Sequence, residues 1–289
     1  MSIRPQIYKF LLIYPNLFCI ITKKEYFCKM KNVMQQDNSI KRIMRLIAIG
    51  IVVITFFIWW RTPFFFDNWD KQTIYIGIID TWYGNSNDSR AHAMWIDDDC
   101  GEGIYKVNQI SNEIGIKPVF AIIPERIPMH LVDSLILWQN NGAGIVLHGL
   151  KHERWKEWSE QRIANDIEHS YEKLHELGFD TAKILKIIVP PYACNTIAIR
   201  KVIRKKGYQM VTGASLVNPD RSVFQLGRIG ITPDTDTTKI RVLLQKAYQQ
   251  NNFVIFGTHS SLPGAFSEEK TIKVLKMAKE IGFDFDFNH

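Results

Sequence analysis

The sequence predicts an α/β protein whose body is a closed or nearly closed β/α barrel, preceded by one transmembrane helix. From about residue 72, seven short runs are apolar almost throughout, which is typical of parallel strands that are covered on both faces. Amphipathic helical patterns lie between or after most of these runs, as repeated βα units require. Upstream of them, fifteen uncharged residues separate Arg45 from Arg61. We therefore expect one membrane-spanning segment followed by one large folded domain.

Composition and charge exclude several other classes of protein. The chain has 289 residues, of which 46% are hydrophobic and 22% charged, so it is neither disordered nor fibrous. Residues 1–62 carry ten Lys and Arg against two acidic residues, whereas the rest carries 26 against 27. The body thus has no electrostatic reason to bind nucleic acid, and we expect no such partner. Four cysteines without CxxC spacing exclude a disulfide scaffold and a structural zinc site.

The predicted membrane segment covers residues 43–60. Its uncharged part, 46–60, spans about 22 Å as a helix, and apolar neighbours extend it toward the roughly 30 Å of a bilayer core. Trp59 and Trp60 stand where an interfacial aromatic belt is expected. The alternative is a buried core helix, but this run is hydrophobic on all sides.

The orientation of this segment follows from the charges around it. Lys41, Arg42 and Arg45 precede it, so the N-terminus is expected in the cytoplasm and the later domain outside, in a single-pass topology. No small-residue cleavage signature follows, which favours an uncleaved signal-anchor in the membrane.

The expected organisation is a cytoplasmic N-terminal segment (1–42), the signal-anchor (43–60), a linker (61–71) and a catalytic domain of residues 72–289. A signal-anchor normally starts near its membrane run, so we hypothesise that translation begins at or near Met34. The alternative is that residues 1–40 form a second, interfacial segment.

The predicted strands and helices follow in chain order. The strands are expected at 91–97, 118–124, 143–149, 184–191, 209–214, 224–231 and 253–259. Apolar residues at helical spacing predict helices around 107–114, 163–177, 197–203, 243–248 and 274–281. Gly178, Gly207 and Gly282 are expected to end helices. A doubly wound open sheet is the alternative, but no GxGxxG follows the first strand.

Polar residues that suit catalysis stand at the ends of four predicted strands, where the active sites of β/α barrels lie. They are Asp97–Asp99, His148 and His152, Pro190–Tyr192, and His259. Three adjacent carboxylates alone are more typical of a solvated loop. Two imidazoles at i and i+4, however, can reach one divalent ion. A carboxylate from a neighbouring strand then completes a ligand set with open positions.

The order and spacing of four motifs resemble the polysaccharide deacetylases of the NodB-homology type, carbohydrate esterase family four. The motifs are WIDDD (95–99), HGLKH (148–152), VPPY (189–192) and IFGTH (255–259), and the resemblance covers roughly residues 90–260. It implies a distorted (β/α)7 barrel, here in a divergent membrane-anchored member.

The resemblance also implies roles for single residues. Asp97 is the expected catalytic base and His259 the general acid, while Asp98, His148 and His152 are the expected ligands of one divalent metal, with Zn²⁺ as the default. Beside Pro191, the backbone N–H of Tyr192 is expected to contact the oxyanion. Trp155 is a further candidate at the substrate, because carbohydrate sites favour aromatic platforms.

Three residues depart from the family pattern. Val189 replaces the arginine that pairs with the base, Gly149 replaces the hydroxyl residue that braces the histidine turn, and Asp99 replaces a glycine. The register within Asp97–Asp99 therefore stays open by one residue. Lys151 and Arg228 are the candidates for another partner of the base.

The expected function is metal-dependent hydrolysis of acetyl groups, carried by C–N bonds of N-acetylated amino sugars, in a cell-envelope or extracellular polysaccharide. A metal ion acidifies water and polarises the carbonyl, a carboxylate deprotonates that water, and a histidine protonates the leaving amine. Two alternatives are a catalytically silent carbohydrate-binding barrel, and another metallohydrolase or glycosidase with Asp97 and Asp99 as paired carboxylates.

Overall fold

The computed structural model describes Gly50 and residues 89–98, 101–213 and 217–285. The chain divides into two compact units, 1–67 and 68–289, and every described residue except Gly50 belongs to the second. The expected N-terminal segment (1–42), the linker (61–71) and all of the signal-anchor (43–60) but Gly50 lie outside the described residues. Within the part that is described, no helix is both long and apolar enough to cross a membrane.

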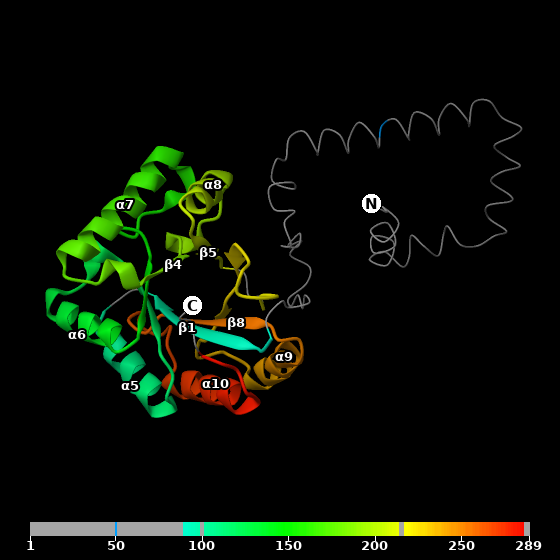
Figure 1. Ribbon diagram of the computed structural model, residues 1–289. Helices are drawn as coiled ribbons and strands as arrows, with labels where there is room; N and C mark the ends of the chain where they lie inside the picture. Colours follow the sequence, from blue (N-terminus) through cyan, green and yellow to red (C-terminus); the bar gives the residue numbers. More distant parts are fainter. Residues whose placement is uncertain (1–49, 51–88, 99–100, 214–216, 286–289) are drawn as a thin grey trace, which may run out of the picture. The chain divides into compact units, whose positions relative to one another are not determined.

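Parallel strands form one curled sheet in the order β6-β5-β4-β3-β2-β1-β8-β7 (Figure 1). The strands are β1 (His92–Asp98), β2 (Val119–Ile122), β3 (Gly144–Leu147), β4 (Ile184–Ile188), β5 (Gln209–Val211), β6 (Gln225–Leu226), β7 (Ile229–Gly230) and β8 (Phe253–Thr258). All seven pairings are parallel. The predicted β/α barrel architecture is confirmed, and its strands begin and end close to the apolar runs.

One predicted strand, 224–231, is divided into two. Its first part, β6, pairs with β5 at one end of the sheet, and its second part, β7, pairs with β8 at the other. The two sheet edges are therefore joined by only Gly227 and Arg228. The Asn218 side chain holds this junction: its Oδ1 accepts from Gly227 N at 2.7 Å and its Nδ2 donates to Gly227 O at 2.9 Å. Side-chain hydrogen bonds replace strand pairing here, which distorts the barrel at one point.

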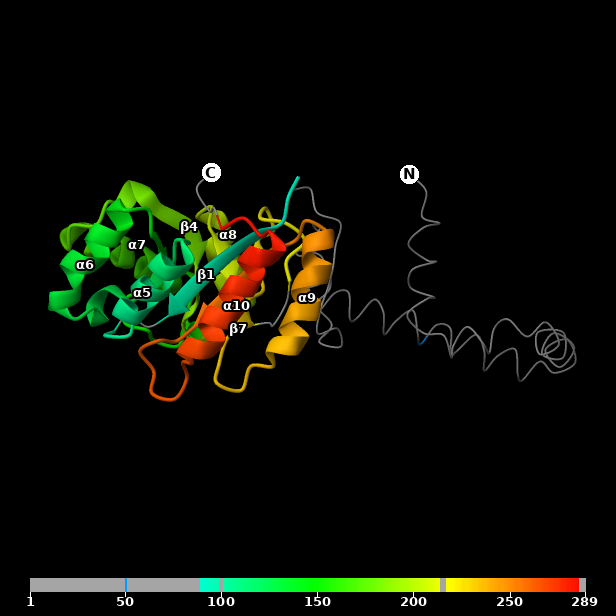
Figure 2. The same cartoon turned by 90° about the horizontal axis from the view of Figure 1, so that it is seen from below.

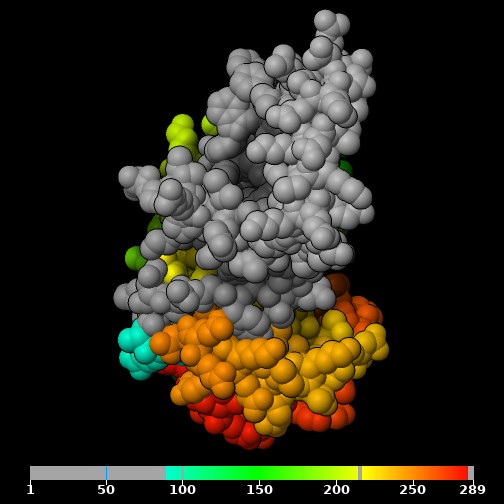
Figure 3. All heavy atoms as spheres, turned by 90° about the vertical axis from the view of Figure 1, so that its right-hand side faces the viewer, coloured from blue at the N-terminus to red at the C-terminus, as the bar shows by residue number. Residues whose placement is uncertain are grey.

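Helices lie outside the sheet, as Figure 1 and the rotated view in Figure 2 show. They are α5 (Ile104–Ile114), α6 (Met129–Asn140), α7 (Glu160–Glu176), α8 (Ile197–Lys205), α9 (Thr237–Gln249) and α10 (Glu268–Ile281), with short 3₁₀ turns η2 (Pro124–Arg126), η3 (Trp155–Glu157), η4 (Thr181–Lys183) and η5 (Pro191–Ala193). The helices α9 and α10 are neighbours, and their atoms lie on one side of the domain (Figure 3).

The helix ends agree with the local sequence. Ser159, Thr196 and Ser267 each accept a backbone N–H from the first turn of the helix that follows, which satisfies amides that have no partner within the helix. Gly178 and Gly282 have φ angles of 93° and 113°, and Gly207 is also left-handed, as expected of C-terminal glycines.

Two hydrophobic layers flank the sheet and fix the direction of the side chains along β1. Met94 and Ile96 belong to the inner layer, which fills the barrel, whereas Trp95 belongs to the layer between sheet and helices. Side chains of a strand alternate between its two faces. Asp98 therefore continues the inner row into the mouth of the barrel, and Asp97 continues the outer row.

Candidate active site

Asp98 is the buried centre of the charged groups at the carboxyl end of the strands. Its side chain is 1% exposed, and its Oδ2 accepts a hydrogen bond of 2.6 Å from Arg228 Nη1. The same oxygen lies 3.4 Å from His259 Nε2 and 4.0 Å from His148 Nε2. Its Oδ1 is buried and has no hydrogen-bond partner among the described residues.

His148 is held with one defined nitrogen toward Asp98. Its Nδ1 lies 2.7 Å from the carbonyl oxygen of Val189. A carbonyl only accepts, so Nδ1 carries a proton, and in the neutral form of the ring Nε2 is the nitrogen with the lone pair. This is the orientation in which a histidine ligates a metal while its other nitrogen is fixed by a hydrogen bond.

The turn from His148 to His152 is tightly built. Gly149 has φ +75°, and a Cβ there would lie 2.8 Å from Pro191 Cγ, so only glycine fits. Asp166 of α7 braces the turn, since its Oδ1 accepts from Leu150 N at 2.9 Å. The replacement of the family's hydroxyl residue by Gly149 therefore does not leave the turn without support.

His152 lies between His148 and Tyr192. The ring centroids of His152 and His148 are 4.6 Å apart, and those of His152 and Tyr192 are 4.5 Å apart. Both His152 and Tyr192 have positive φ, 58° and 56°, a strained conformation for residues other than glycine. The Tyr192 side chain is 53% exposed, so one face of this cluster is open to solvent.

Asp97 is buried in a set of hydroxyl and amide donors. Its Oδ1 accepts from Thr258 Oγ1 at 2.6 Å and from Ser260 N at 3.0 Å, and its Oδ2 accepts from Ser260 Oγ at 2.6 Å. Thr258 in turn accepts from Trp95 Nε1 at 2.9 Å. The three hydrogen bonds to Asp97 thus all come from neutral donors.

The two aspartates differ in their protonation. Burial raises the pKa of Asp97 to about 7, although the hydrogen bonds from Ser260 and Thr258 oppose the shift. Burial also acts to raise the pKa of Asp98, but nearby positive groups, foremost Arg228, outweigh it and hold that pKa below its ordinary value. At neutral pH Asp98 is thus an anion, whereas Asp97 exchanges a proton readily.

Some expected site residues lie elsewhere or outside the described residues. Trp155 is fully buried in the hydrophobic core and packs against Gly149. The expectation that its ring faces the substrate is therefore wrong. Lys151 pairs with Glu125 at 3.2 Å, and Arg228 pairs with Asp98, so neither is the partner of Asp97. Asp99 lies outside the described residues.

The residues at this mouth fit a divalent cation in their chemistry. They offer a buried carboxylate oxygen without a hydrogen bond, Oδ1 of Asp98, and an imidazole whose proton is fixed on the far nitrogen. In residues 89–98, 101–213 and 217–285, however, no three His, Cys, Asp or Glu side chains already stand as a ligand cluster. Asp98 Oδ2 instead accepts a hydrogen bond from Arg228 Nη1, so a cation that used this oxygen would have to displace the arginine.

Sequence reasoning missed Ser260, Thr258 and Asp166. Ser260 follows His259 directly in the sequence. Its position beside a histidine at the end of a strand could have predicted that it lies at the site. The role of Thr258 was hidden because it lies in an apolar run. Asp166 lies within α7, where a carboxylate usually faces solvent.

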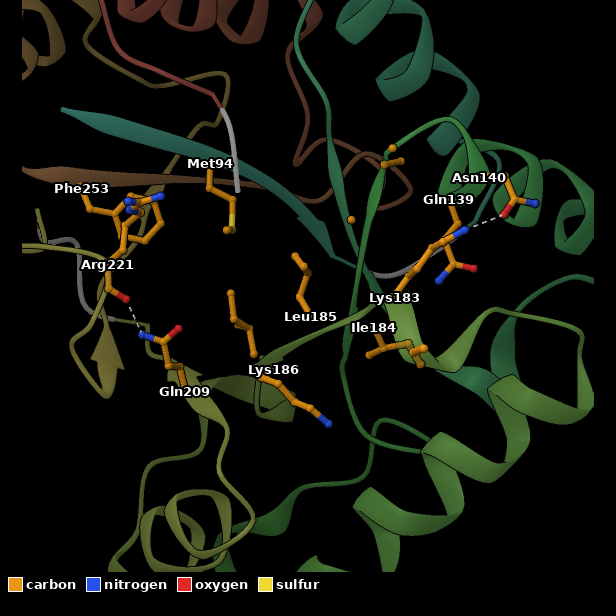
Figure 4. Close-up of a pocket in the computed structure, with 15 residues that line it drawn as sticks. Met94, Gln139, Asn140, Lys183, Ile184, Leu185, Lys186, Gln209, Arg221 and Phe253 are labelled. Atoms are coloured by element: carbon orange, nitrogen blue, oxygen red, sulfur yellow. Dashed lines mark hydrogen bonds between the residues drawn. The ribbon is translucent and has the colours of Figure 1, made fainter. Parts of the chain in front are cut away.

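A cavity of about 560 Å³ lies away from this site, at the amino ends of the strands (Figure 4). Met94, Leu185 and Phe253 line it, and Gln209 at its side donates to the carbonyl oxygen of Arg221 at 2.6 Å. Because catalytic residues of β/α barrels gather at the opposite end, this cavity is separate from the candidate active site.

Part of this chain is similar to known proteins. Residues 84–211 match the family model described as polysaccharide deacetylase. A family 4 acetyl xylan esterase from Clostridium thermocellum, solved with a cobalt ion, has a similar fold (TM-score 0.50, 13% identity, 66% of this chain and 85% of that chain). A search of curated proteins finds no match.

Two further solved structures are similar to this chain. A polysaccharide deacetylase from Bacillus cereus is 16% identical over 69% of this chain and 93% of that chain, with a TM-score of 0.48. The chitin deacetylase of Colletotrichum lindemuthianum is 12% identical over 71% of this chain and 87% of that chain, also with a TM-score of 0.48.

Proposed function

We propose that this protein is a divalent-metal-dependent hydrolase of N-acetylated amino sugars in a cell-envelope or extracellular polysaccharide. The match of residues 84–211 to the polysaccharide deacetylase model supports this proposal. Water attacks the acetamide carbonyl, the C–N bond breaks, and acetate and a free amine leave. The observation that carries the proposal is the pair Asp97 and Asp98. These two adjacent buried carboxylates have opposite pKa shifts, as separate roles in one reaction require.

Asp97 suits the role of the base that takes a proton from the attacking water. Its Oδ1 already accepts two hydrogen bonds, from Thr258 and Ser260, whereas Oδ2 accepts one. A carboxylate oxygen has two lone pairs, so Oδ2 keeps one for the water. A pKa of about 7 for Asp97 matches a base that works near neutral pH.

Asp98, His148 and His152 are the residues that would hold the cation. When bound, it supplies Lewis acidity that polarises the acetyl carbonyl and acidifies water. Asp98 contributes a full negative charge, and His148 contributes Nε2, held in place by the Val189 carbonyl. The similar esterase from Clostridium thermocellum was solved with a cobalt ion, which supports a divalent cation here. The choice of Zn²⁺ follows from the His2Asp donor set.

His259 and Tyr192 complete the proposed machinery. His259 Nε2 lies 3.4 Å from Asp98 Oδ2 at the end of β8, and the ring is partly exposed, so it can deliver a proton to the departing amine. The Tyr192 ring lies 4.5 Å from the His152 ring, and we assign to the Tyr192 backbone N–H the role of stabilising the oxyanion. The exposed Tyr192 ring offers a face on which a sugar can stack.

The test is acetate release by the full chain, after chelation and after addition of Zn²⁺ or Co²⁺, from peptidoglycan, chitin oligomers, poly-N-acetylglucosamine and acetylated xylan. We expect turnover of an amino-sugar polymer that chelation abolishes and the ion restores. Release from acetylated xylan alone would replace the amide substrate by an ester. Tight sugar binding without turnover would favour the silent barrel, and metal-independent cleavage of sugar chains would favour the glycosidase.

We further propose that residues 43–60 anchor the protein in a membrane with residues 61–289 on the extracytoplasmic side. The uncharged run and the basic residues before it support this topology. Carbonate extraction of membranes from expressing cells should leave the full chain in the pellet, and external protease should digest its catalytic domain. Recovery of the chain in the carbonate supernatant would contradict the anchor.

A further inference from the structure

Arg228 reaches Asp98 from the point where the sheet is interrupted. It follows Gly227 in the junction between β6 and β7, which the Asn218 side chain fixes through two hydrogen bonds. Its side chain is 14% exposed, and its Nη1 donates to Asp98 Oδ2 at 2.6 Å. A charge-assisted contact of this length between two mostly buried groups is strong.

The neighbouring strand leaves room for the arginine. A Cβ at Gly257 of β8 would lie 2.9 Å from Arg228 Cδ, closer than side chains approach one another. Residue 257 must therefore be small for Arg228 to cross β8 and reach the mouth of the barrel. The pairing thus depends on two separate features, the junction at Gly227 and the absence of a side chain at Gly257.

The ion pair between Arg228 and Asp98 also contributes to the folding stability of the metal-free domain. Asp98 is 1% exposed, and a buried carboxylate without a compensating charge is costly. Arg228 is a permanent cation, unlike His148 and His259, whose charge depends on protonation. It therefore supplies to Asp98 the positive charge that a bound metal would supply.

We propose that Arg228 is a built-in substitute for the metal: it stabilises Asp98 while no cation is bound and competes with the cation for that carboxylate. This inference rests on the proposed role of Asp98 as a metal ligand. It implies that Arg228 weakens metal affinity and, in return, keeps the metal-free domain folded. A residue that merely supported the metal site would have the opposite effect on affinity.

The test compares Arg228→Met with the wild-type full chain after chelation. The affinity for Zn²⁺ and Co²⁺ is measured by calorimetry, and the melting temperature is measured with and without each ion. We expect the variant to bind at least about tenfold more tightly, to melt at a lower temperature without metal, and to gain more from added metal than the wild type does.

Lys151→Met is the matched control. It removes one positive charge near the same mouth, but Lys151 pairs with Glu125 and does not contact Asp98. We expect its metal affinity to stay within about twofold of the wild type. An equal tightening in both variants would reduce the effect to general electrostatics and overturn the specific role of Arg228.

Two further variants keep the inference testable if Arg228→Met does not fold without metal. Arg228→Lys keeps the charge but loses the planar fork, and Gly257→Ala displaces the arginine without removing it. Both should bind the ions more tightly than the wild type and melt lower when metal-free. Unchanged or weaker binding in these variants, with the wild type binding normally, overturns the inference and leaves the proposed function intact. A wild type that binds neither ion and releases acetate despite chelation would instead refute the metal dependence.

Discussion

The two faces of β1 shift the pKa values of two neighbouring carboxylates, Asp97 and Asp98, in opposite directions. On the outer face, the described partners of Asp97 are neutral donors from Thr258 and Ser260. On the inner face, Asp98 meets the guanidinium of Arg228 and two imidazoles. Burial is nearly complete for both, so it cannot account for the difference. Neutral hydrogen bonds do not offset the cost of burying a charge, whereas a permanent cation does.

The largest effect is expected from Asp98→Asn. The substitution removes the negative charge that Asp98 presents to Arg228, His259 and His148. On the proposed mechanism the divalent ion should then be lost, and acetate release should fall by at least about a thousandfold. Metal content by atomic emission and initial rates of acetate release measure both effects. The exposed Asp234→Asn, which makes the same chemical change, should lose neither. A variant that retained metal and rate would exclude Asp98 as a ligand.

Asp97→Asn should distinguish the role of Asp97 from that of Asp98. The amide keeps the shape and one acceptor but cannot take a proton, so we expect kcat to fall by about 10² to 10⁴ while metal content stays near that of the wild type. If metal is lost together with activity, the division of roles between the two aspartates is wrong.

The stability of the chelated protein should report the pKa of Asp97. In the native state Asp97 keeps its proton up to about pH 7, whereas an unfolded aspartate loses it near pH 4. Between these values the native state binds more protons, so the free energy of unfolding falls as pH rises, by up to a few kcal/mol. Denaturant titrations from pH 4 to 8 measure this slope, which Asp97→Asn should remove. Equal slopes in both proteins would show that Asp97 has an ordinary pKa.

The smallest effect is expected from Ser260→Ala. It removes one hydrogen bond to Asp97 Oδ2, so kcat should fall about tenfold. Because the Ser260 hydrogen bonds lower the pKa of Asp97, the acid limb of the rate profile should also move to higher pH. Ser260→Thr should restore both quantities. Ser261→Ala is the control, since Ser261 accepts from Gly101 N and does not contact Asp97; an equal loss there would mean that the loop, not Asp97, is affected.

Much of the fold can be predicted from the sequence, because apolar runs and helical periodicity reflect which residues are buried. The run 224–231 was the exception. Its mostly apolar sequence predicts one strand and does not reveal that the Asn218 side chain forms two hydrogen bonds with the Gly227 backbone. Within the site, Asp98, His148 and His259 do gather at one mouth. The pairing of Arg228 with Asp98 was not foreseeable, because it depends on the space above Gly257. Trp155 was misjudged because an aromatic residue in a loop suits a platform and a core equally well.

The pairing of β1 with β8 has a consequence for how the protein is made. These strands are neighbours in the sheet, yet Asp97 and Thr258 are 161 positions apart in the chain. Contacts between such remote segments form late and slow folding. During synthesis, β1 can pair with β2 early, but its other edge stays unpaired until β8 has been synthesised. The chemistry at Asp97 and Asp98 cannot begin until the C-terminal third has been synthesised and docked.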